Sequence, residues 1–310
     1  MLKIFQNKVV IKIAGGLGNQ LFQYAMGRAI SIEKNIPLWL DISFFKNDSY
    51  YHRIYLLNQF HIKAEVVLIE AYPNNKYLNQ FMKLKKKIDR YRDKKHRMFL
   101  DEPDFLDDSK ASMENYFAGG PCHRFDASLV SDISSNVVLS GYWQSEKYFK
   151  PIRNILFEDL TITANIPENI QTFGSYIQSV NSVCIGIRQY SDFAASANHF
   201  KLTAEYYEKA MKLISSKIEN PHFFIFTLER QWAEENIKSD FPITLVTPNR
   251  LNEDAYLDLY LISHCKHFII ANSTYHWWGA YLSKNKEKIV IAPKQGWGNS
   301  EPLPHEWIKI

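Results

Sequence analysis

The sequence predicts an α/β protein with two domains, each built on a parallel sheet. The length of 310 residues, with 46% hydrophobic and 23% charged residues, suits two globular domains of ordinary size. Short apolar runs alternate with helical patterns in both halves, which is typical of parallel sheets covered by helices. A stretch of mixed polarity with Pro151 and Pro167 separates the halves. We therefore expect domains at 1–160 and 161–310 that face one cleft.

The composition argues against several classes of protein. Cys122, Cys184 and Cys265 are odd in number and widely spaced, so neither a disulfide framework nor a cysteine-based zinc site is indicated. The net charge of +4 is too small to indicate binding to nucleic acid. The N-terminal residues lack the form of a signal peptide, and no apolar run reaches membrane-spanning length. We expect a cytoplasmic protein.

The first domain opens with a strand–loop–helix–strand pattern. Residues 9–14 are an apolar strand, 15–20 are a glycine-rich loop and 21–30 have helical spacing. A second strand at 37–41 completes a β-α-β unit and hence a parallel pair. A glycine loop between a strand and a helix brings backbone N–H groups toward a phosphate.

The glycine loop offers several contacts to a ligand. Gly16 and Gly18 would let the backbone approach closely, and the amides of Asn19 and Gln20 are donors and acceptors. The third glycine of a dinucleotide fingerprint would fall at Leu21, and the Gly-Lys-Ser/Thr of a P-loop is missing. An ordinary tight turn between strand and helix is the alternative.

Two further segments of the first domain allow alternative interpretations. The basic run from Lys83 to Arg97 could contact an anionic membrane at its inner, cytoplasmic face or form a solvated helix face, since acidic residues dilute its charge. A strand at 137–141 is followed by an aromatic and polar cluster at 142–149. That cluster could stack on a sugar ring or close the first domain.

The second domain alternates strands and helices throughout. Arg188 follows one strand directly, where a guanidinium can make paired hydrogen bonds to a diphosphate or bind nearby Asp192. Glu229 follows the next strand, where it could accept from a base or ribose or face solvent. The expected elements are a helix at 170–179, a strand at 182–187, a helix at 203–217, strands at 223–226 and 245–247, an amphipathic helix at 254–265 and a strand at 268–271.

The last of these strands leads into a helix rich in aromatic residues. Asn272, Ser273 and Thr274 separate the two elements and read as the helix N-terminus. A helix that starts at the carboxyl end of a parallel strand directs unpaired N–H groups and a positive dipole end toward an anion. The following residues Trp277, Trp278 and Tyr281 would either pack the helix or wall a pocket.

Taken together, four segments resemble the bacterial α-1,2-fucosyltransferases of glycosyltransferase family 11, in the expected order over nearly the whole chain. The segments are GGLGNQLFQYA from Gly15, GYWQSEKYF from Gly141, DLYLISHCKHFIIANSTYHWWGAYLS from Asp258 and the closing APKQGW with EWIKI. The resemblance implies a GT-B-like pair of Rossmann-like domains, with the acceptor on the side of the first and the nucleotide sugar bound by the second.

The same resemblance implies inverting, metal-independent transfer of L-fucose from GDP-fucose to a hydroxyl, usually the 2-OH of a galactoside in a surface glycan or lipopolysaccharide precursor. No Asp-x-Asp occurs in the chain, in agreement with a diphosphate bound without a cation.

The family motif His-x-Arg-Arg-Gly-Asp reads here as 186–192, with glycine for the histidine, Arg188 kept, Gln189 for the second arginine and the acid moved to Asp192. The family motif Phe-Ser-Asp-Asp-x-x-Trp reads here as Phe226 to Trp232, and of its two acids only the second is kept, as Glu229.

We therefore expect the glycine loop, Arg188 and the helix start at Ser273 and Thr274 to surround one diphosphate. Arg188 would stabilise the leaving phosphate, and Asp192 would take the acceptor proton, with Glu229 and His276 as alternatives. The departures from the motif leave open a transferase for another GDP-hexose and an inactive protein that binds nucleotide sugars or glycans.

Overall fold

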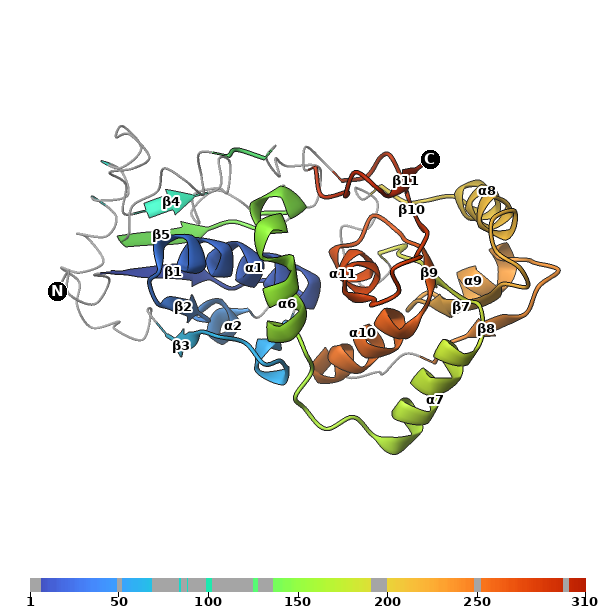
Figure 1. Cartoon of the computed structure of the whole chain (residues 1–310), viewed down its shortest axis with the longest axis horizontal. Coiled ribbons are helices and arrows are strands. Elements are labelled where there is room, and N and C mark those ends of the chain that lie inside the picture. Colours follow the sequence, from blue (N-terminus) through green and yellow to red (C-terminus); the bar gives the residue numbers. More distant parts are fainter. Residues whose placement is uncertain are drawn as a thin grey trace. The chain divides into compact units, whose positions relative to one another are not determined.

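The computed structural model describes residues 7–48, 52–68, 84, 88, 99–101, 125–127, 136–190, 200–247, 252–297 and 301–310. These residues form two compact units, each of which is described by itself (Figure 1). The first unit holds the described residues up to Thr161 together with Glu301 and Pro302, and the second holds the others from Ile162 onward.

A five-stranded sheet forms the first unit, with all its strand pairs parallel and the order β3-β2-β1-β5-β4. Its central strand is an unbroken apolar run because both faces are covered: Val9, Val10 and Ile11 are completely buried. The strands are β1 (Lys8–Lys12), β2 (Leu38–Asp41), β3 (Glu65–Val67), β4 (Phe99–Asp101) and β5 (Asn136–Ser140).

The helix α1 (Leu17–Lys34) covers this sheet and starts at its carboxyl end, directly after the glycine loop. It ends at Asn35, whose left-handed backbone (φ 51°) donates its N–H to the last turn of the helix. The remaining short helices described in this unit are α2 (Phe44–Asn47), α6 (Arg153–Asp159) and three 3₁₀ turns at Leu57–Gln59, Glu146–Tyr148 and Lys150–Ile152.

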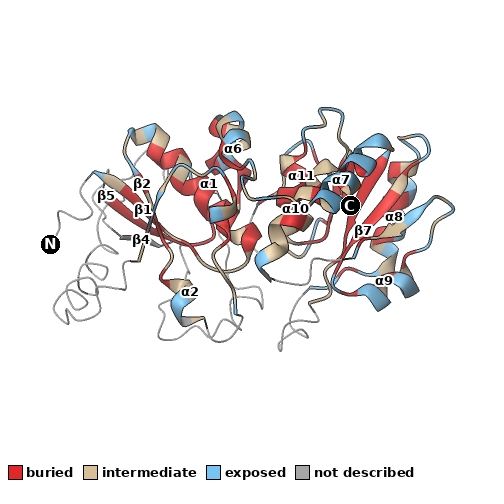
Figure 2. Ribbon diagram, turned by 90° about the horizontal axis from the view of Figure 1, so that it is seen from below, coloured by how far each residue is buried: buried red, intermediate tan, exposed pale blue. Residues whose placement is uncertain are grey.

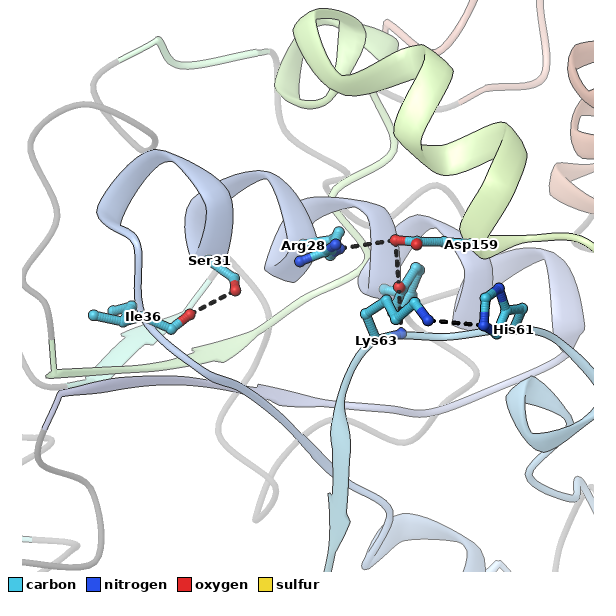
Figure 3. Close-up of polar contacts among 7 residues, drawn as sticks. Arg28, Ser31, Ile36, His61, Lys63 and Asp159 are labelled. Carbon is cyan, nitrogen blue, oxygen red and sulfur yellow. Dashed lines mark hydrogen bonds and ion pairs between the residues drawn. The ribbon is translucent and has the colours of Figure 1, made fainter.

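A buried polar cluster fastens α6 to α1 (Figure 3). The Asp159 carboxylate accepts from Arg28 Nε at 2.8 Å and from Tyr24 Oη at 2.8 Å. The same phenol oxygen accepts from the Lys63 N–H at 3.0 Å. Burial raises the pKa of Tyr24 well above its ordinary value, so the phenol remains a donor to Asp159. The last helix before the second unit is therefore anchored in the first.

The second unit contains a six-stranded parallel sheet in the order β11-β10-β9-β6-β7-β8. Buried residues concentrate on its strands and on the inner sides of its helices (Figure 2). The core packs Val183, Ile185 and Phe223 of the central strands against Tyr207 and Ile214 of a covering helix. The strands are β6 (Ser182–Gly186), β7 (His222–Phe226), β8 (Ile243–Leu245), β9 (His267–Ile269), β10 (Val290–Ala292) and β11 (Ile308–Lys309).

The helices described in this unit follow the predicted alternation, with one difference in character. The segment predicted as an amphipathic helix forms α10, but none of its residues is exposed, because it packs against both α7 and α11. A Cβ added to Gly279 would lie 2.2 Å from Ile262 Cγ2, so glycine permits the approach of α11 to α10. The helices are α7 (Glu168–Ser179), α8 (Ala204–Ser215), α9 (Arg230–Asn236), α10 (Ala255–His264), α11 (Thr274–Leu282) and a 3₁₀ turn at Asn252–Asp254.

Both predicted parallel sheets are confirmed, and the expected strand at 245–247 lies two residues earlier, at β8. The basic run from Lys83 to Arg97 lies outside the described residues except for Leu84 and Ile88, so its membrane contact stays a prediction. Within the parts of the chain that the structure describes, no helix has the length and apolar character needed to span a bilayer.

Candidate active site

Three adjacent strands of the second unit end at one rim of the sheet, and the residues that follow them form the candidate site. β6 lies between β7 and β9, and all three run parallel. Arg188 follows β6, Glu229 follows β7 and the start of α11 follows β9. We call this the second-unit rim, which consists of Arg188, Tyr190, Thr227, Glu229, Asn272, Ser273, Thr274 and His276.

Arg188 and Glu229 form a largely buried ion pair. The distance from Arg188 Nη1 to Glu229 Oε1 is 3.6 Å, and the side chains are 16% and 5% exposed. Glu229 Oε2 accepts from the Thr227 hydroxyl at 3.0 Å, which orients the carboxylate. The guanidinium also lies over the ring of Tyr190, 4.8 Å from its centroid. Glu229 therefore faces Arg188 rather than solvent.

The N-terminus of α11 lies at the same rim. Ser273 is the N-cap, with extended backbone (φ −133°) and no capping hydrogen bond from its side chain. The first intrahelical bond runs from the Trp277 N–H to the Ser273 carbonyl at 2.9 Å. The N–H groups of the first turn consequently have no carbonyl partner within the helix and create a positive potential at the rim.

Asn272 joins the loops around the rim. Its Nδ2 donates to the carbonyls of Phe200 at 3.0 Å and Gly296 at 3.2 Å, while the Tyr190 hydroxyl donates to the Asn272 carbonyl at 3.0 Å. The side chain is buried, and its Oδ1 has no hydrogen-bond partner among the described residues. Asn272 therefore holds three segments together at the end of β9.

His276, in the first turn of α11, is a rim residue that the sequence offered only as an alternative base. Its side chain is buried, and Nδ1 lacks a hydrogen-bond partner in the described part of the chain. Burial and the nearby Arg188 charge lower the pKa of His276 to about 3, so the ring is neutral at physiological pH. Its place in a first helical turn was visible in the sequence, but its neighbours were not.

The aromatic residues of α11 pack the core instead of lining a pocket. Trp277, Trp278 and Tyr281 are at most 1% exposed, and the Trp277 and Tyr281 rings stack with centroids 4.6 Å apart. The Trp307 ring packs against Trp277, with their centroids 5.4 Å apart. The packing interpretation is confirmed. Asp192, the expected base, lies outside the described residues.

The glycine loop lies at the carboxyl end of the first unit's sheet. Gly15 adopts a positive φ of 76°, and Gly16 is the N-cap of α1. A Cβ added to Gly16 would meet no atom within 4 Å, so its backbone faces open space. Gly18 is buried in the first turn of α1. Gln20 is completely buried and bonds the carbonyls of Gly15 and Ile54 and the N–H of Leu56.

A second loop joins the glycine loop at this end of the sheet. Gln23 accepts from the Ala14 N–H at 2.9 Å and donates to the Gly141 carbonyl at 3.0 Å. Gln144 Nε2 donates to Asn19 Oδ1 at 3.1 Å. The first-unit rim, which consists of 14–20, Gln23 and 141–144, is thus cross-linked by its own amides. Tyr142, Trp143 and Tyr148 are buried, as expected if the cluster closes the first domain.

The family model of glycosyl transferase family 11 matches residues 8–308. The chain belongs to glycosyltransferase family 11. It is 27% identical over 317 residues to an α-1,2-colitosyltransferase of Escherichia coli, covering 97% of this chain and 98% of that protein. It is 28% identical to the O-antigen biosynthesis glycosyltransferase WbnK of Escherichia coli, over 96% of this chain and 99% of the relative.

The chain is also similar to a mammalian enzyme and to a solved plant structure. Galactoside α-(1,2)-fucosyltransferase 2 of Rattus norvegicus is 24% identical over 47% of this chain and 44% of its own. The structure of an Arabidopsis thaliana FUT1 mutant in complex with GDP matches with a TM-score of 0.50 at 11% identity, covering 92% of this chain and 70% of that one. The fold is of the GT-B type, and the protein is a glycosyltransferase.

Proposed function

We propose that this family 11 enzyme transfers L-fucose from GDP-fucose, with inversion, to the 2-OH of a galactoside in an O-antigen or related surface glycan. Relatives named for colitosyl transfer, O-antigen biosynthesis and galactoside fucosylation support this proposal. The main observation behind it is the second-unit rim, where a largely buried guanidinium and a helix N-terminus lie at the ends of adjacent strands. Colitose is the alternative sugar, because one relative is a colitosyltransferase.

The leaving group dominates the proposed chemistry. As the bond from the anomeric carbon to the phosphate oxygen breaks, negative charge grows on the departing diphosphate while the sugar becomes oxocarbenium-like. Arg188 and the first-turn N–H groups of α11 would stabilise that charge, because they are fixed before the reaction begins. Glu229 would hold Arg188 in place through the 3.6 Å ion pair and the Thr227 hydrogen bond.

The acceptor hydroxyl must also lose its proton. We assign this role to Asp192, four residues after Arg188 in the sequence. His276 is a poor base near neutral pH, since its pKa is about 3. Glu229 is buried against Arg188 and serves the ion pair. Gly16, Gly18 and Asn19 of the first unit stay predicted ligand contacts.

The proposed reaction needs no metal ion. Among the described residues, no group of three or more His, Cys, Asp and Glu side chains is arranged to hold one. The proposal rests on the positive groups of the second-unit rim, which supply the charge that a cation would otherwise provide. Turnover should be unchanged after treatment with EDTA, and restoration of activity by added Mg²⁺ or Mn²⁺ would contradict this.

Incubating the purified protein with GDP-fucose and a panel of galactosides tests the function. The expected product carries an α-1,2-linked fucose, identified by NMR and mass spectrometry. GDP-colitose and GDP-mannose serve as competing donors. Transfer of colitose in preference to fucose would correct the donor, while neither transfer nor donor hydrolysis with any nucleotide sugar would favour a binding protein.

A further inference from the structure

The ring of His276 stands over Gly186, the last residue of β6. A Cβ added to Gly186 would lie 2.5 Å from Cγ, 2.6 Å from Nδ1 and 2.8 Å from Cδ2 of the imidazole. Real Cβ atoms essentially never come this close, so no side chain fits at position 186 while the ring is there. Arg188 follows only two residues later, and the imidazole senses its charge.

Burial of the His276 imidazole costs free energy, because one ring nitrogen makes no hydrogen bond within the described residues. Nδ1 has no hydrogen-bond partner among the described residues, although most buried polar atoms in proteins are paired. The ring lies in the first turn of α11, near enough to Arg188 to be affected by its charge, so the helix N-terminus and the guanidinium both favour an anion. A neutral ring in such a site can donate one hydrogen bond to an anion without adding charge.

We propose that His276 is a ligand-contacting residue, whose imidazole donates a hydrogen bond to the diphosphate that Arg188 binds, with Gly186 making the necessary space. The identity of the ligand rests on the proposed function. The contact explains the glycine that replaces the histidine of the family motif at this position, because an imidazole reaches the same space from α11 instead of from β6. The two positions are therefore coupled.

Calorimetric titration with GDP and GMP tests this proposal. His276→Phe keeps a ring of similar size but removes the donor, so GDP affinity should fall about tenfold or more. GMP affinity should fall less, because the lost contact is to the diphosphate. His264→Phe is the matched control, since this histidine bonds the Tyr260 carbonyl on α10 and should leave both affinities unchanged.

The coupling is tested by moving the imidazole. Gly186→Ala alone should lower thermal stability, because its methyl group collides with the ring. The double variant Gly186→His with His276→Gly places the ring on β6 and should bind GDP within about threefold of wild type. This variant also keeps the proposal testable if His276→Phe fails to fold.

The outcomes separate this inference from the proposed function. A wild-type protein that binds no GDP contradicts the proposed function. If wild type binds GDP and His276→Phe binds it with the same affinity, only the proposed role of His276 is overturned. Equal losses for GDP and GMP would show that the ring only packs α11. A double variant that binds GDP no better than His276→Phe would show that the two positions are not coupled.

Discussion

The rims of the two sheets have the same strand–turn–helix plan but use their polar side chains differently. In the first-unit rim, Gln20 and Gln23 bond backbone groups of the surrounding loops, and Gln144 bonds Asn19. In the second-unit rim, His276 Nδ1 and Asn272 Oδ1 are buried without partners among the described residues. Similar sequence signals thus mark a cross-linked turn in one unit and, in the other, the rim that we propose binds an anion.

The largest expected effect falls on Arg188 in the second-unit rim. Arg188→Ala should lower turnover roughly 10²- to 10³-fold, because it removes a fixed donor at the leaving diphosphate. Arg230→Ala is the control, since this exposed arginine pairs with Glu234 on α9 and should leave turnover unchanged. Steady-state kinetics with GDP-fucose measures both. An Arg188→Ala protein that keeps more than about a tenth of its turnover rules out the assignment.

A large structural effect is expected at Asp159 in the first unit. Asp159→Ala leaves the partly buried Arg28 charge and the buried Tyr24 hydroxyl without their acceptor, so the free energy of unfolding should fall by about 3 kcal/mol. Thermal unfolding followed by circular dichroism measures the loss. Glu208→Ala, which breaks an exposed pair with Lys212, should leave the melting temperature unchanged. Equal melting temperatures for the two variants would show that the cluster does not anchor α6.

Replacing Gln20 tests whether the polar side chains of the first-unit rim stabilise the fold, in contrast to those of the second-unit rim. Gln20→Ala removes the partner of two partly buried carbonyls and of the buried Leu56 N–H, so the free energy of unfolding should fall by about 2 kcal/mol. Gln171→Ala removes an exposed amide hydrogen bond and should have no measurable effect. If Gln20→Ala instead melts normally and binds GDP more weakly, the first-unit rim contacts ligand directly and the contrast fails.

The pH dependence of stability isolates His276. Because burial and Arg188 lower its pKa to about 3, the unfolded chain binds a proton between about pH 6.5 and pH 3 that the folded chain does not. The free energy of unfolding should therefore decrease as the pH is lowered through this window. His276 should account for about 2 kcal/mol of the loss at pH 5. Burial also lowers the pKa of His222, His264 and His267, in the same direction.

Comparing wild type with His276→Phe removes the shared contribution of the other histidines. The variant should lose less stability than wild type between pH 7 and pH 5, as measured by urea unfolding. Parallel pH profiles for the two proteins would mean that the ring of His276 is already solvated in the folded state.

The sequence predicts the strands well because they are short apolar runs with clear ends, such as 182–187 and 223–226. The character of α10 is not predicted, since the spacing of its polar residues hides the fact that α7 and α11 cover it from two sides. Residues 290–292 are too few to indicate a strand before their pairing with β9 is known. In the sequence, Arg188 and Glu229 are separate candidates, and only the parallel pairing of β6 with β7 makes them partners.

The contact between Gly186 and His276 is the feature of the site that is hardest to predict from the sequence. The two residues are distant in the chain, and neither has a local pattern that points to the other. Their meeting depends on the placement of α11 after β9, which lies next to β6 in the sheet. Such couplings arise from topology, so they follow from the structure and not from motifs.

The central claim is that the second-unit rim binds the diphosphate of a nucleotide sugar. Titrating GDP into wild type, Arg188→Ala and Arg230→Ala by isothermal calorimetry tests it most directly. Wild type and Arg230→Ala should bind GDP with equal affinity, and Arg188→Ala should bind it at least about tenfold more weakly. Equal GDP affinity in all three proteins, each with an unchanged melting temperature, would contradict it.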